Sequence, residues 1–85
     1  MTTVSYHARE RRLVIADADA PGDADQVAAA IADCAQPDHL LVVDLTYLPS
    51  VPAAIAAAVD GACRDAERRG CAVRVWTAAP VTAGV

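Results

Sequence analysis

The sequence predicts an α/β fold: a mixed, mostly parallel four-stranded sheet in the order ββαβαβ, with its helices packed on one face. Three observations lead to it. The run at 40–45, LLVVDL, is short and almost wholly apolar, as expected of a buried strand. A long alanine-rich stretch follows and leads to a β-prone run at 71–76, the pattern of parallel strands joined through a helix. Two β-prone runs around a charged tripeptide open the chain, as in a hairpin.

The length and composition predict one small domain. A chain of 85 residues holds one domain, expected at 1–76, with a core of modest size. The segment 77–85 contains Pro80 and Gly84 and has no periodicity, which indicates a flexible C-terminal tail. The apolar fraction of 55% is rich in alanine and includes no Phe, so the core has little surplus and association with a partner is favoured.

The first half of the chain is predicted to hold a hairpin, an acidic loop and a helix. The hairpin joins 3–8 to 12–16, and polar residues alternate along its first strand, as at an edge with one wet face. The segment 17–25 is an acidic loop in which Asp23 is expected to cap a helix at 24–35. The buried stripe of that helix is expected at Val27, Ile31 and Cys34.

A second, longer helix follows the central strand. Ser50 is predicted to cap it, because Pro52 then lies in the first turn, where a proline costs little. Gly70 fits the left-handed residue just past the helix end. Its first half, 53–58, is apolar on all sides. Such a surface is expected to be covered within the protein or to bind a partner. The alternative is that the alanines serve only to favour the helix. The face expected to be buried comprises Val51, Ile55, Val59, Ala62, Cys63 and Ala66.

The charge pattern narrows the range of partners. The net charge of −4 argues against binding to nucleic acid or to an anionic membrane. Aspartates gather between 17 and 38 with no basic residue among them, which favours either a basic partner surface or a solvated acidic helix face.

The sequence predicts a cytoplasmic protein without direct membrane insertion. Its first residues lack the apolar core of a signal peptide, and no apolar run approaches the ~18 residues of a spanning helix. Cys34, Cys63 and Cys71 are odd in number and occupy apolar-patterned positions, which indicates reduced, buried thiols.

No pattern in the sequence predicts an active site. Asp44 ends a strand, where a catalytic acid could lie, but no base or nucleophile is placed beside it. His7 and His39 stand alone, the cysteines lack CxxC spacing, and the glycine motifs that bind phosphate are missing. The loop from Asp17 is similar to the start of a calcium loop, but Ala28 stands where the bidentate glutamate is needed. We therefore expect no catalytic residue, no metal and no cofactor.

The segment LLVVDLTYLPSVPAAIAAAV, followed by RDAERRGCAVRVW, resembles the STAS domain, the fold of anti-sigma-factor antagonists. In that family a strand ends in Asp-Leu, a short turn leads to a helix that begins at Asp-Ser-Ser-Gly, and the helix ends in Gly before another strand. Upstream, LVIADAD resembles the second strand and the Gly-x-Leu-Asp loop of the family, with Asp19 in the place of its aspartate. The resemblance covers roughly residues 3–76 and implies a STAS-like sheet.

The chain departs from the family at the phosphorylated serine, which is an alanine here. The Asp-Ser-Ser-Gly positions fall on Pro52, Ala53, Ala54 and Ile55. Ser50 and Thr46 are the hydroxyls left for phosphorylation, although both precede the first turn of the helix. The family also continues through a further helix after the fourth strand. Without that helix, core-facing surface is expected to be exposed, which favours a dimer or a dedicated partner.

The resemblance implies a bacterial, cytoplasmic protein-binding module of signalling and transcription regulation, not an enzyme. Its partner would be an anti-sigma factor or a serine-kinase-like regulator with a basic edge. The binding surface would combine the loop 17–19 with the start of the second helix, because both follow the carboxyl ends of adjacent parallel strands. Its residues are Asp17, Asp19, Ser50, Val51, Pro52, Ala53, Ala54 and Ala57.

Other functions stay open on the same residues. Some stand-alone STAS proteins are accessory subunits of membrane-transport ATPases, and a small domain of this kind also serves as a self-associating structural module or homodimer. A small-molecule binder or an enzyme would need a buried pocket with converging polar groups beside Asp44 or Asp19.

Overall fold

A computed structural model describes residues 2–18 and 22–78. The elements follow the predicted order ββαβαβ. They are β1 (Thr3–His7), β2 (Arg12–Ala16), α1 (Asp23–Cys34), β3 (Leu40–Leu45), α2 (Ala53–Arg68) and β4 (Ala72–Thr77). Thr77, which we expected in the tail, is thus the last residue of a strand; Ala78 follows it, and residues 79–85 of the predicted tail lie outside the described residues.

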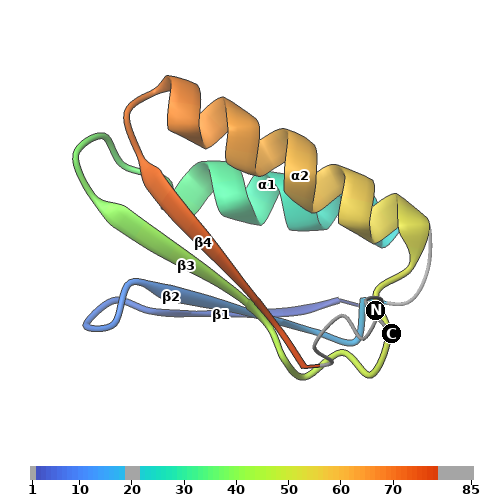
Figure 1. The fold of residues 1–85 in the computed structure, drawn as a ribbon. Coiled ribbons are helices and arrows are strands. Elements are labelled where there is room, and N and C mark those ends of the chain that lie inside the picture. The colour runs from blue at the N-terminus through green and yellow to red at the C-terminus, as the bar shows by residue number, and fades with distance from the viewer. Residues whose placement is uncertain (1, 19–21, 79–85) are drawn as a thin grey trace, which may run out of the picture.

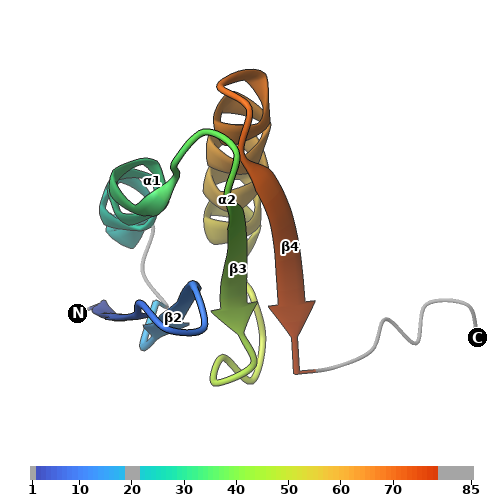
Figure 2. The same ribbon diagram turned by 90° about the vertical axis from the view of Figure 1, so that its left-hand side faces the viewer.

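The four strands form one mixed, mostly parallel sheet in the order β1-β2-β3-β4. β1 is antiparallel to β2, whereas β2, β3 and β4 run parallel to one another. Both helices pack on the same face of this sheet, α1 on the side of β1 and β2 and α2 on the side of β3 and β4 (Figures 1 and 2). The predicted α/β architecture is confirmed at this level.

The opening hairpin explains why β1 is an edge strand. The turn closes through two backbone hydrogen bonds, from the Glu10 N–H to the His7 carbonyl and from the Arg11 N–H to the Ala8 carbonyl. Arg11 has a φ of 50°, in the left-handed region. The short loop leaves β2 to pair with β3 on its other side, so β2 is internal and β1 is exposed, as the alternation of polar residues predicted.

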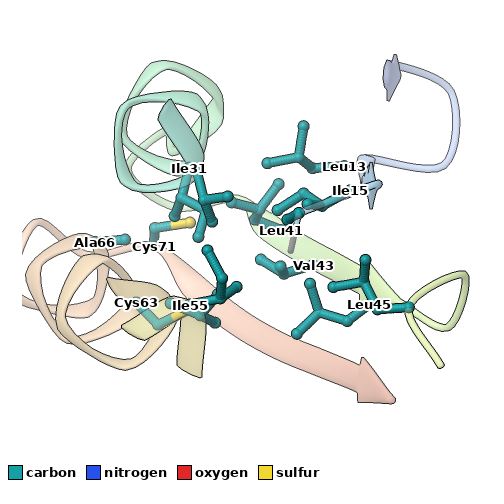
Figure 3. Close-up of a cluster of buried hydrophobic side chains, with 14 residues drawn as sticks. Leu13, Ile15, Ile31, Leu41, Val43, Leu45, Ile55, Cys63, Ala66 and Cys71 are labelled. Atoms are coloured by element: carbon teal, nitrogen blue, oxygen red, sulfur yellow. The ribbon is translucent and has the colours of Figure 1, made fainter. Parts of the chain in front are cut away.

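The hydrophobic core lies between the two helices and one face of the sheet. Alternate residues of β2 and β3, among them Leu13, Ile15 and Val43, are fully buried there. Figure 3 shows Ile31 of α1 and Ile55 of α2 directed into the same cluster. Cys63 and Cys71 are buried as predicted. Cys34 is only half-buried, because it ends α1, at the margin of the core.

Both predicted helix caps are wrong. α2 begins after Pro52, which has extended dihedrals of −58° and 151° and whose carbonyl accepts the Ala56 N–H at 2.9 Å. A residue before proline is disfavoured in the helical region, so a helix starting at Ser50 would have strained Val51. α1 begins at Asp23 itself, because Gly22 occupies the cap position with helical dihedrals. Neither cap position contributes a side-chain hydrogen bond to its helix.

The end of α2 matches the prediction. Gly70 has a φ of 94°, which L-residues with a Cβ rarely adopt. Its N–H donates to the Glu67 carbonyl, and the Cys71 N–H donates to the Ala66 carbonyl. This pair of bonds satisfies the last carbonyls of the helix and turns the chain directly into β4.

Candidate functional site

The fold places the two predicted halves of the binding surface at one edge of the sheet. β2 and β3 are parallel neighbours, so their carboxyl ends meet at the same edge. Asp17 follows β2 and is exposed, and its Oδ2 accepts a hydrogen bond from the Thr3 hydroxyl at 3.1 Å. The segment 46–52 follows β3 and leads into α2. Asp19, the other predicted acidic residue, lies outside the described residues.

The start of α2 carries an exposed surface of alanine methyl groups. Ile55 is fully buried in the core and anchors the first turn. Val51 and Pro52 are half-buried beneath that turn. The alanines that face solvent around it are Ala53, Ala54, Ala56 and Ala57. The first turn has no acidic residue, so this end of the helix is apolar and uncharged.

Thr46 is one of the two hydroxyls considered for phosphorylation, and its hydroxyl is already engaged. Both its backbone N–H, at 2.9 Å, and its hydroxyl donate to Asp44 Oδ1. A phosphate on Thr46 would break the hydroxyl bond and stand beside a buried carboxylate, which is electrostatically unfavourable. Ser50 is exposed and lies two residues before the helix cap.

Asp44 is buried at 3% exposure although neither of the two helices in the described residues covers its face of the sheet. Its Oδ2 lies 3.8 Å from Nε of Arg12, which also lies 3.3 Å from Glu10 Oε1. Arg12 Nε is itself buried and has no hydrogen-bond partner among the described residues. Asp44, the next-to-last residue of β3, is therefore part of a charged pair: one of its oxygens accepts hydrogen bonds from Thr46 in the turn and the other faces the Arg12 guanidinium. Sequence reasoning missed this pair, because it depends on the register of β2 against β3.

The helix-free face of the sheet carries an aromatic and basic group that the sequence analysis did not single out. In the register of β3 and β4, Arg74 lies beside Val42, and Trp76 lies beside Asp44. Trp76 is 45% exposed. The alternation in AVRVWT, with Arg74 and Trp76 two residues apart, was the available signal.

A mainly apolar groove of about 300 Å³ runs between α2 and the outer edge of β4. Val75, at 44% exposure, lies on its strand side, and Val59 and Cys63 lie on its helix side. A second hollow, of about 450 Å³, lies between the outer faces of α1 and α2 and is lined mostly by small residues such as Ala28 and Gly61. Neither hollow includes Asp44.

Two of the three thiols have a raised pKa. Burial, followed by the charges of Glu67 and Asp60, raises the pKa of the Cys63 thiol from 9.0 to about 11. Burial and the Asp33 carboxylate raise the pKa of Cys34 as well. Both thiols are protonated at neutral pH and hence unreactive. Within residues 2–18 and 22–78, no three His, Cys, Asp or Glu side chains are grouped so as to hold a metal ion.

Comparison with known proteins assigns no family. No family model matches the chain, and no curated protein or solved structure matches it. In the part of the chain that the structure describes, no helix is long and apolar enough to cross a membrane.

Proposed function

We propose that the protein is a cytoplasmic protein-binding module similar to an anti-sigma-factor antagonist of the STAS type. It binds a regulatory kinase or an anti-sigma factor without being phosphorylated at the position the family uses. The observation that carries the proposal is the edge where β2 and β3 end, since Asp17 and the segment that leads to the exposed alanines of α2 both follow the carboxyl ends of these parallel neighbours. An apolar centre with a charged rim is the usual make-up of a protein interface.

Two further observations support this proposal. The element order and the sheet order, with an antiparallel β1 and helices on one face, agree with the architecture that the resemblance implies. The hydroxyl of Thr46 is held by Asp44, and α2 begins with alanine instead of serine. Binding is therefore proposed to be regulated by the partner, not by a phosphate on this chain.

The test is capture of partners by the tagged full chain in its native cells, followed by titration of the purified partner. We expect an anti-sigma factor or a serine kinase to bind, and Ala57→Arg to weaken the affinity by about 2 kcal/mol, roughly 30-fold. Ala29→Arg is the matched control, because Ala29 is equally an exposed helical alanine but lies on α1.

The outcomes separate the candidate functions. Loss of the regulatory partner with Ala57→Arg but not with Ala29→Arg supports the proposal. A transport ATPase as the captured protein would favour the accessory-subunit alternative instead. Equal binding by both variants would show that the start of α2 is not the binding surface.

A further inference from the structure

β4 is an edge strand with the features of a pairing surface. It pairs with β3 through all six of its residues, without a bulge, and with no other strand among the described residues. Its large side chains are exposed on both faces, Val75 on the helix side at 44% and Trp76 on the helix-free side at 45%. Natural edges are usually protected by proline, bulges or several charges, and β4 has only Arg74.

The backbone of β4 is directed so that it can accept another strand. The Ala72 N–H donates to the His39 carbonyl at 2.9 Å and therefore points toward β3. Because backbone groups alternate in direction along a strand, those of Val73 and Val75 point outward. A second strand can thus pair with β4 through the N–H and C=O groups of these valines.

We propose that a second copy of this chain occupies that edge, joining β4 to β4 in antiparallel fashion about a two-fold axis at Val75. The two sheets then form one continuous sheet. Val75 faces Val75 of the second copy as a hydrogen-bonded pair. Arg74 lies opposite Trp76 of the second copy, and the symmetry repeats this contact.

Side-chain charge favours the register with the axis at Val75 over the register with the axis at Arg74. In the continuous sheet, residues on the helix side of one copy must lie opposite residues on the helix side of the other. This requires the two-fold axis to pass through a residue of β4 and not between two residues. With the axis at Arg74, the two guanidinium groups would stand directly opposite each other and repel. With the axis at Val75, each guanidinium instead meets the exposed indole of Trp76, a favourable cation–π contact. Arg74 and Trp76 of the second copy form a non-hydrogen-bonded pair, the kind of antiparallel pair in which opposed side chains lie closer together.

The groove between α2 and β4 supports the same axis. Val75 lines this groove with Val59 and Cys63, and no residue of the described segments 2–18 and 22–78 fills its space of about 300 Å³. Val75 of the second copy, placed opposite on the helix side, covers the mouth of the groove. One contact thus pairs the strand edge and buries the adjoining apolar surface.

Sedimentation equilibrium of the full chain tests the proposal, with the emission of its single tryptophan as a second signal. We expect a monomer–dimer equilibrium with a dissociation constant on the order of micromolar, as for small interfaces. The emission of Trp76 should change with the same midpoint, because the guanidinium of the second copy covers the indole. A monomer up to about 1 mM would overturn the proposal.

Variants test the surface and the register separately. Val75→Lys places two ammonium groups on the axis and should abolish the dimer, whereas Ser5→Lys, on the other edge strand, should leave it intact. Arg74→Gln should weaken the dimer about tenfold by removing two cation–π contacts. A tighter dimer with Arg74→Gln would place the axis at Arg74 and overturn the register.

The dimer and the partner surface of the previous subsection are tested independently. Ala57 lies on the exposed start of α2 and is not among the residues that line the groove, although its neighbour Ala56 is. Ala57→Arg should therefore leave the dissociation constant of the dimer unchanged. Loss of the dimer with Ala57→Arg but not with Val75→Lys would assign self-association to the start of α2 and overturn the β4 interface.

Discussion

The two faces of the sheet are buried by different means. On one face, α1 and α2 cover Leu13, Ile15 and Val43 completely, and these residues contact apolar side chains from both helices. The other face holds Val42 and Asp44 and has no helix above it among the described residues, yet these two side chains are only 6% and 3% exposed. Their neighbours in the register include the long side chains of Arg12, Arg74 and Trp76, which can lie across the strand with their polar ends in water.

This difference indicates that the faces have different roles. The helix-covered face supplies the packing that holds the chain together, because close-packed apolar side chains are costly to remove. The helix-free face has a buried charged pair and an exposed indole, which contribute less packing but present a distinct chemical surface. Substitutions on the two faces should therefore differ in their effect on stability.

The largest expected effect separates the faces directly. Leu13→Ala should lower the free energy of unfolding by about 3–4 kcal/mol, because it opens a cavity beneath both helices. Trp76→Ala should lower it by about 1 kcal/mol or less, since the indole is half exposed. Urea unfolding followed by circular dichroism, at a concentration where the chain is monomeric, measures both. Equal losses would contradict the assigned difference between the faces.

An intermediate effect is expected from the buried charge of the helix-free face. Asp44→Ala removes the acceptor of the Thr46 N–H and hydroxyl and leaves the half-buried Arg12 guanidinium with only the exposed carboxylate of Glu10. We expect a loss of about 2–3 kcal/mol in the free energy of unfolding. Asp65→Ala is the control, because Asp65 also meets an arginine, Arg69, at 2.7 Å but in an exposed pair worth about 0.5 kcal/mol or less. Similar losses for the two variants would show that burial of Asp44 has no energetic role.

The smallest expected effect is a pH dependence of the free energy of unfolding, which arises from Cys63 in the core on the helix-covered face. The pKa of Cys63 is raised in the folded chain from 9.0 to about 11, so the folded state holds its proton more firmly than the unfolded state does. The associated stability is present below pH 9 and is lost as the pH rises toward 11, by about 1–2 kcal/mol. The difference in unfolding free energy between pH 8 and pH 10.5 should be smaller in Cys63→Ala than in the natural chain. An identical difference would mean that this thiol does not titrate differently on unfolding.

Much of the fold could be predicted because its signals are local. The apolar run at 40–45 and the periodicity of Val27 and Ile31 gave the right elements, and Gly70 marked the end of α2. The helix caps were predicted less well than the elements. Pro52 disfavours helical dihedrals at the residue before it, so α2 begins after Pro52 and Ser50 lies outside the helix.

The candidate site was predictable in position but not in chemistry. The placement of Asp17 and the start of α2 at one edge follows from the parallel connection between β2 and β3. The role of Asp44 did not follow, because Arg12 is distant along the chain and reaches it only through strand register. The exposure of Trp76 likewise depends on which strand ends the sheet.

By itself, the sequence determined the type and order of the elements, because propensity and hydrophobic periodicity act within a few residues. It also determined that one face of each helix must be covered. The tertiary structure alone decided that β4 is the second edge of the sheet, which side chains meet across β2, β3 and β4, and which face has no helix above it among the described residues. These features depend on contacts between segments far apart along the chain, and no local pattern encodes them.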